Sequence, residues 1–128
     1  FNRSTKKSPQ GFNIHEINTV LAEDIFFKGV LRFKGSLMIN GKFEGDIDAE
    51  EGHLYIGKNA TVTARIKASI VSNMGLIEGD VETSKRFELY TGSRIDGDVI
   101  TPDLKIEPGS KLNGNCTTIK EEIIPKIN

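Results

Sequence analysis

The sequence has few of the residues that build metal clusters, disulfides or histidine-dependent active sites. Its 128 residues include one cysteine, two histidines and no tryptophan. One cysteine cannot form a disulfide within the chain, and these few ligands do not make an ordinary His/Cys metal cluster. We therefore expect no metal, no other cofactor and no enzymatic activity that depends on histidine. The lack of a disulfide framework is typical of the cytosol.

Charge of one sign and long apolar runs are also missing. Lysine and arginine number 17 and aspartate and glutamate 18, so there is no overall basic field to attract nucleic acid. The longest apolar clusters, such as residues 25–27, are far shorter than the roughly 20 residues that span a bilayer. No apolar segment of a secretory signal follows the N-terminus, which begins at Phe1 rather than methionine. The length favours a single domain.

What the sequence has in abundance is glycine, with 13 residues, and much of it follows a repeat. The pattern apolar-x-small-x-apolar occurs six times, at steps of 16, 19, 15, 18 and 17 residues. The small residues are Gly29, Gly45, Ala64, Gly79, Gly97 and Gly114. The flanking apolar pairs are Phe27 and Leu31, Phe43 and Ile47, Val62 and Ile66, Ile77 and Val81, Ile95 and Val99, and Leu112 and Cys116.

A second set of alternating apolar pairs recurs between these copies. The pairs are Leu37 and Ile39, Leu54 and Ile56, Phe87 and Leu89, and Leu104 and Ile106, with Ile70 and Ser72 at the equivalent place in the irregular copy. Turn residues follow, and Pro108-Gly109 has the order of a type II turn. Alternation between turns predicts strands.

A unit of about 17 residues cannot bury its apolar face alone, so the copies are expected to stack. We predict an all-β, single-domain β-solenoid of about six coils over residues 14–118, between flexible tails at 1–13 and 119–128. Residues 14–25 fit an incomplete first coil, which we favour, or a short helical cap. The small-residue column is expected to face the interior, where a larger side chain would collide with the opposite wall.

Outward residues of this solenoid form charged columns. Arg65 is predicted between Asp46 and Asp80, and Lys67 between Asp48 and Glu82. The like-charged neighbours Asp80 and Asp98 have no explanation at this level. A solvated face is the favoured interpretation, and an electrostatic docking strip is the alternative.

Motifs for catalysis or nucleotide binding fail in their context. Residues 52–59 nearly match the phosphate-binding loop, but Asn59 replaces the hydroxyl residue that binds Mg²⁺, and a strand pattern follows where the loop needs a helix. His53 and His15 are interpreted as surface histidines with no serine or cysteine placed to use them. Cys116 takes an inward apolar position and is expected to behave as a small buried hydrophobe.

The ends of the solenoid are the predicted functional site. End coils expose unpaired backbone groups and a cross-section of apolar side chains, and no polar capping repeat follows the last coil. The candidate interface residues are Phe26, Phe27 and Leu31 in the first coil and Leu104, Ile106, Leu112 and Cys116 in the last. Two such ends predict an open filament.

These residues resemble the bactofilin family over residues 18–118. The most specific stretches are residues 18–21, residues 33–47 and the repeated Glu/Asp-Gly-Asp-Val. The resemblance implies a right-handed parallel β-helix that polymerises without nucleotide into non-polar filaments. It further implies a scaffold on the inner face of the cytoplasmic membrane for cell-shape and cell-wall proteins. Polymerisation in this family depends on apolar residues of the terminal coil, and the resemblance implies that these are Leu104, Ile106 and Leu112 here.

Some bactofilins carry an N-terminal membrane-targeting peptide, which Phe1, Arg3, Lys6, Lys7 and Ser8 resemble if a methionine precedes them. An aromatic anchor with three cations binds an anionic leaflet weakly, and a filament would add avidity. A solvated basic tail is the alternative. For the whole protein, the alternatives are a monomeric β-solenoid binding module and a hexapeptide-type acyltransferase. The latter would need a six-residue repeat and a placed catalytic histidine.

Overall fold

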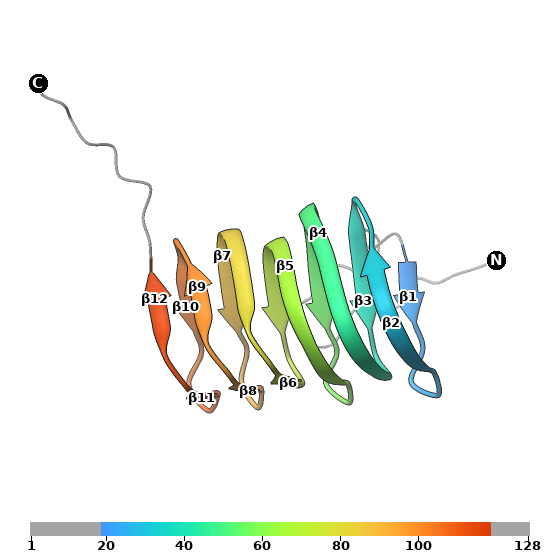
Figure 1. The fold of residues 1–128 in the computed structure, drawn as a ribbon. Helices are drawn as coiled ribbons and strands as arrows, with labels where there is room; N and C mark the ends of the chain where they lie inside the picture. The colour runs from blue at the N-terminus through green and yellow to red at the C-terminus, as the bar shows by residue number, and fades with distance from the viewer. Residues whose placement is uncertain (1–18, 119–128) are drawn as a thin grey trace, which may run out of the picture.

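The structure is a computed structural model that describes residues 19–118. These residues form twelve strands without a helix, and all the strands pair in parallel in one sheet (Figure 1). The strands are β1 (Thr19–Leu21), β2 (Phe26–Arg32), β3 (Ser36–Ile39), β4 (Lys42–Ile56), β5 (Thr61–Asn73), β6 (Leu76–Glu78), β7 (Val81–Leu89), β8 (Arg94–Asp96), β9 (Val99–Thr101), β10 (Leu104–Ile106), β11 (Lys111–Asn113) and β12 (Cys116–Thr118). Within this range there is accordingly no helix that could cross a membrane.

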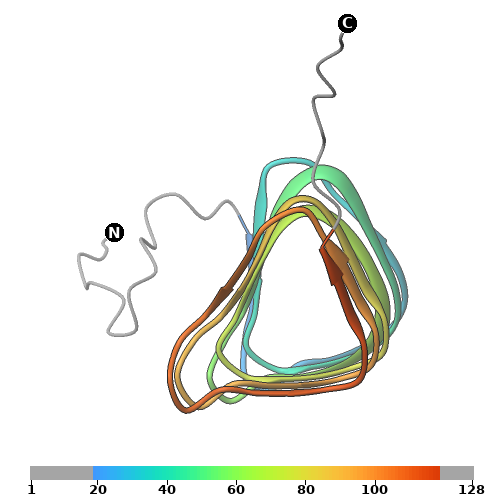
Figure 2. The same ribbon diagram turned by 90° about the vertical axis from the view of Figure 1, so that its left-hand side faces the viewer.

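The strands wind into a triangular solenoid of about six coils, as the sequence predicted. Figure 2 shows the solenoid along its axis, with the C-terminal end toward the viewer. The chain rises on the right and descends on the left as it comes toward the viewer. This path is that of a right-handed solenoid. Face A holds β1, β3, the ends of β4, β5 and β7, and β10. Face B holds the starts of β2, β4 and β5, then β6, β8 and β11. Face C holds the end of β2, the middles of β4 and β5, the start of β7, then β9 and β12.

The strand register confirms the predicted apolar columns, because equivalent residues of successive repeats are direct partners across neighbouring coils. One interior column runs Phe27, Phe43, Val62, Ile77, Ile95 and Leu112. The rings of Phe27 and Phe43 stack with centroids 5.3 Å apart. Residues of the middle coils in this column are fully buried, so the core is a continuous stack along the axis.

The sequence interpretation of the irregular third copy is wrong by one residue. Val71, not Ile70, pairs with Leu54 and Phe87, and Asn73, not Ser72, follows it in the interior. Register shifts near residues 49–53 and 68–70 move the inward positions along by one. Asn73 is fully buried, and its amide donates to the Arg94 carbonyl and accepts the N–H of Gly75. These bonds satisfy a polar side chain inside an apolar column.

The predicted role of the glycine column is also wrong. The five glycines of this column do not line the interior: they lie where face B turns into face C, and Gly45 and Gly114 are exposed, whereas Ala64 belongs to the buried core. Gly97 has φ +152°, and a Cβ there would meet the Gly79 carbonyl oxygen of the preceding coil at 2.0 Å. Glycine is required because coils approach closely at a corner with positive φ.

The same corner explains the two neighbouring aspartates. The Asp80 carboxylate accepts the backbone N–H of Asp98 at 3.0 Å, and the Asp98 carboxylate accepts that of Asn115 at 3.1 Å. Each aspartate therefore satisfies a backbone donor of the next coil, which offsets the repulsion between like charges.

Candidate polymer interface

The C-terminal end of the solenoid exposes the last members of the interior columns. Leu104 pairs with Phe87, Ile106 with Leu89, Leu112 with Ile95 and Cys116 with Val99. The four inner partners are at most 1 % exposed, whereas Leu104, Leu112 and Cys116 are half-buried and Ile106 is 52 % exposed. The side chains are equivalent in position, so the difference arises because no further coil within residues 19–118 covers them.

The N-terminal end of residues 19–118 is open in the same way. Leu21, Phe27 and Leu31 are half-buried against the core, and the Phe27 ring stacks on Phe43 of the next coil. Residues 19–21 form the incomplete first coil that the sequence favoured over a helical cap. Both ends therefore present apolar cross-sections.

Phe26 does not belong to this end surface, contrary to the sequence interpretation that grouped it with Phe27. Successive residues of a strand point to opposite sides, so only one of the two can face the core. Phe26 is 58 % exposed on the lateral surface, beside Lys42 of the next coil.

Backbone hydrogen-bonding groups are also open at both ends within residues 19–118. The last strands, β10, β11 and β12, pair only with β7, β8 and β9. The first strands, β1 and β2, pair only with β3 and β4. Edges of this kind are templates for pairing with another chain.

Cys116 behaves as the small hydrophobe that the sequence predicted. It lies at the end of the column that contains Val99, and partial burial raises the pKa of its thiol. A raised pKa lowers the thiolate fraction at neutral pH, so the thiol is a poor nucleophile. The side chain contributes contact area rather than reactivity.

A polar cluster on face A was missed from the sequence. His53 Nε2 lies 2.8 Å from Ser72 Oγ, and the Ser72 hydroxyl donates to Glu88 at 2.8 Å. Arg86 donates to the same carboxylate at 2.7 Å, as does Tyr90 at 2.9 Å. His53 is half-buried, and Ser72, a neighbour that the sequence did not reveal, lies beside its imidazole. With the register of the third copy corrected, the repeat places Ser72 between Tyr55 and Glu88, and His53 lies two residues before Tyr55 on the same strand.

The geometry of this cluster is structural rather than catalytic. The proton of Ser72 is directed to Glu88 instead of His53, and Ser72 is only 1 % exposed. Burial alone would raise the pKa of Glu88, but the hydrogen bonds from Ser72, Tyr90 and Arg86 and the Arg86 charge outweigh it and lower that pKa. Burial and the Glu88 carboxylate raise the pKa of Tyr90 to about 12. Beside the cluster, Tyr55 stacks on His53 with ring centroids 3.9 Å apart.

The predicted membrane-binding residues Phe1, Arg3, Lys6 and Lys7 lie outside the described residues, as do both predicted tails. The predicted end residues from Phe27 to Cys116 divide between the two ends of the solenoid, and each end brings its own set together.

Comparison with known proteins agrees with this architecture. A family model described as "Bactofilin: Polymer-forming cytoskeletal" matches residues 19–117. The chain is 32 % identical over 98 residues to Bactofilin BacO of Myxococcus xanthus (strain DK1622), which covers 77 % of each of the two proteins. No solved structure gives a significant match. The family match spans all six repeats, and the chain therefore belongs to the bactofilin family of polymer-forming cytoskeletal proteins.

Proposed function

We propose that the protein self-assembles end to end into filaments through the two open ends of its solenoid. The observation that carries the proposal is the contrast within single columns, because Leu89 is 1 % exposed and its end-coil partner Ile106 is 52 % exposed. A second copy placed on the end would cover these side chains and pair with the open backbone edges. Burial of apolar area is the main driving force for such association.

Assembly of this kind needs no nucleotide. Its driving forces are apolar contact and backbone hydrogen bonding, and neither requires a bound phosphate. The stretch that nearly matches a phosphate-binding loop covers the end of β4 and the turn before β5, so a strand follows it where phosphate binding needs a helix N-terminus. Symmetric use of the two ends, C-terminal against C-terminal and N-terminal against N-terminal, gives filaments without polarity.

The filament is further proposed to bind the inner face of the cytoplasmic membrane and to scaffold proteins of cell shape or cell-wall synthesis. The support is the basic N-terminal segment with Phe1, Arg3, Lys6 and Lys7, multiplied along a filament. Liposome flotation of residues 1–13 fused to a soluble carrier tests the anchor. Binding to anionic vesicles that survives both high salt and removal of Phe1 would contradict it.

Negative-stain microscopy without nucleotide tests end-to-end assembly. Leu104→Arg and Leu112→Arg are expected to give short oligomers that keep the β circular dichroism signal, because each places a charge in the apolar cross-section. Thr63→Arg is the control, since Thr63 is exposed on face B of a middle coil. Unchanged filaments in both end variants would contradict the interface. Monodisperse wild-type particles at high concentration would instead favour a monomeric binding module.

A further inference from the structure

Face C carries charges whose sign alternates from coil to coil. Arg32 lies beside Asp48, Asp48 beside Lys67, and Lys67 beside Glu82, so one outward column reads plus, minus, plus, minus over the first four coils. A parallel column reads the same way over three coils, with Asp46, Arg65 and Asp80 as minus, plus and minus. In both columns the sign changes with each coil up to the fourth coil; in the fifth coil Asp98 follows Asp80, and the uncharged Ile100 follows Glu82.

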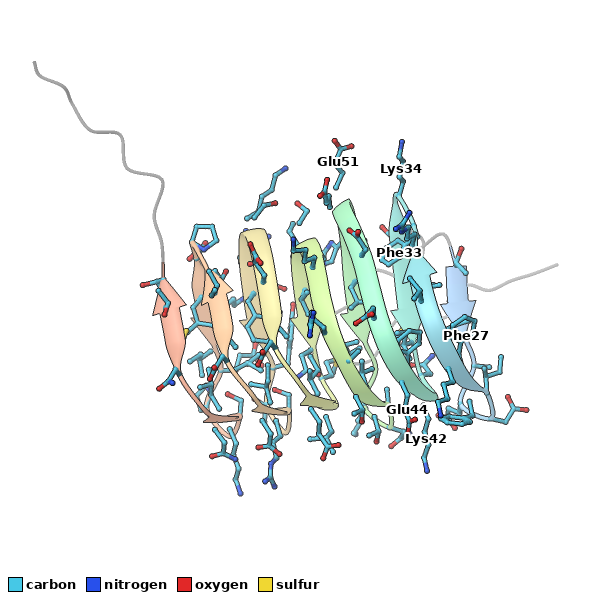
Figure 3. All side chains as sticks on the ribbon, viewed as in Figure 1. Phe27, Phe33, Lys34, Lys42, Glu44 and Glu51 are labelled. Carbon is cyan, nitrogen blue, oxygen red and sulfur yellow. The ribbon has the colours of Figure 1, made fainter. Side chains whose placement is uncertain are left out.

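These charges are available to a partner. All are exposed except Asp48, which is half-exposed. Within residues 19–118, the ion pairs shorter than 4.0 Å are Arg86 with Glu88 and Arg94 with Asp96, and neither involves the two columns of face C. Shallow hollows along the edge of this face are lined by Arg32 and Asp48 in the first coils and by Lys67 and Glu82 further along. Lys34 and Glu51 point away from the solenoid in Figure 3 and leave the face open.

The sequence of signs is complementary to itself when one copy is turned end for end. A twofold axis that lies between the second and third coils, along the strand direction, places the first coil opposite the fourth and the second opposite the third. Arg32 then faces Glu82 of a second copy, Asp48 faces Lys67, and Asp46 faces Arg65. Both members of each pair occur in both copies, as an isologous interface requires.

A parallel arrangement of the two copies does not bring opposite charges together. A twofold axis along the solenoid places each coil opposite its own equivalent and brings the two columns against each other. Asp48 then faces Asp46, Lys67 faces Arg65, and Glu82 faces Asp80. Like charges in apposition are unfavourable, so the pattern selects the antiparallel arrangement.

We propose that face C is a lateral interface at which a second copy of this chain binds in antiparallel orientation. The interface extends the proposed function by adding a side-to-side contact to end-to-end assembly. It rests on that function, because end-to-end assembly is what repeats the side-to-side contact along a filament. Each exposed ion pair is weak alone. Pairs repeated along two filaments act together, so the expected assembly is a paired filament that separates as salt screens the charges.

Charge reversal tests the interface by electron microscopy of filament width in about 10 mM and about 1 M salt, where the screening lengths differ about tenfold. The wild type is expected to form paired filaments at low salt and single filaments at high salt. Lys67→Glu is expected to give single filaments at low salt. The double variant Asp48→Lys with Lys67→Glu is expected to restore pairing, because it exchanges the two signs. Lys58→Glu, an equal charge change in an exposed turn of the same coil, is expected to pair like wild type.

The proposal would be overturned if Lys67→Glu formed paired filaments at low salt as often as the wild type does. It would also be overturned if the double variant formed only single filaments while Lys58→Glu formed paired ones. The result is separable from that for the ends: long filaments that never pair at low salt refute the lateral interface alone. If no filaments form, end-to-end assembly fails, and sedimentation velocity of the same variants reports salt-sensitive dimers directly. A wild type that remains monomeric at low salt in that assay refutes the lateral interface.

Discussion

The corner between faces B and C gives a sharp test of why glycine recurs in this sequence. Gly97 and Gly92 both have positive φ, at +152° and +88°. Their surroundings differ, because a Cβ on Gly97 would lie 2.0 Å from the Gly79 carbonyl oxygen, whereas a Cβ on Gly92 would meet no atom within 4 Å. Replacement of each by alanine therefore separates backbone strain from the close approach of coils.

The magnitudes follow from the two environments. Gly92→Ala incurs only the strain of a left-handed backbone, about 1–2 kcal/mol. Gly97→Ala incurs backbone strain of about 1–3 kcal/mol. It also forces the coils apart, because a backbone carbonyl cannot swing aside. Two bonds span that corner, from the Gly79 N–H to Asp96 and from the Gly97 N–H to Asn113, both at 2.9 Å. With about 0.5–1.5 kcal/mol for each bond, the total loss is about 2–6 kcal/mol.

Thermal unfolding followed by circular dichroism, at one protein concentration for both variants, measures the difference. Gly97→Ala is expected to unfold at a clearly lower temperature than Gly92→Ala. Equal melting temperatures would refute the reasoning, since they would show that the corner accommodates a Cβ and that only φ selects glycine.

Three further substitutions probe the core, the corner and the face A cluster. Phe43→Ala is expected to cost about 3–5 kcal/mol of folding stability, and Phe27→Ala less, because Phe27 is covered on one side only; equal losses in thermal unfolding would contradict the end exposure. Asp98→Ala is expected to lose about 1 kcal/mol of folding stability, because it leaves the Asn115 N–H without its acceptor. Asp98→Asn keeps a side-chain oxygen as acceptor and should lose less stability. A larger loss of stability in Asp98→Asn would show that the charge, not the hydrogen bond, matters. Because folding lowers the pKa of Glu88, its carboxylate stabilises the fold fully above its ordinary pKa of 4.5, and this stabilisation is lost as the pH falls through the folded-state pKa. The stability advantage of wild type over Glu88→Gln should therefore shrink in denaturation experiments at decreasing pH. A stability difference that stays constant from neutral to strongly acidic pH would refute this assignment.

Sequence periodicity predicted the architecture and most of the end surface. The alternation in pairs such as Ile95 and Val99 requires strands, and the recurrence at about 17 residues requires stacking. The same logic identified Leu104, Leu112 and Cys116 as column ends, because no repeat follows them. Phe26 was misassigned because it was grouped with Phe27 by apolar character alone. The two residues are adjacent in one strand and therefore lie on opposite sides of it.

The errors around Ile70 and Ser72 share another cause, which is that register is a property of the folded chain. Near Ile70 the pattern is locally ambiguous, and only pairing with both neighbouring coils shows that Val71 and Asn73 face inward. The cluster around Ser72 and Glu88 was hidden for the same reason.

What the sequence by itself determined is therefore the repeat: a β-solenoid of stacked coils with glycine at a fixed place and with apolar ends. What only the tertiary structure decided is what each column touches. It placed the glycines at a crowded corner rather than in the interior, because close approach is set by the backbone of the adjacent coil. It also brought the charges of face C into ordered columns, because parallel pairing aligns side chains about 17 residues apart in sequence within one strand spacing, about 4.8 Å.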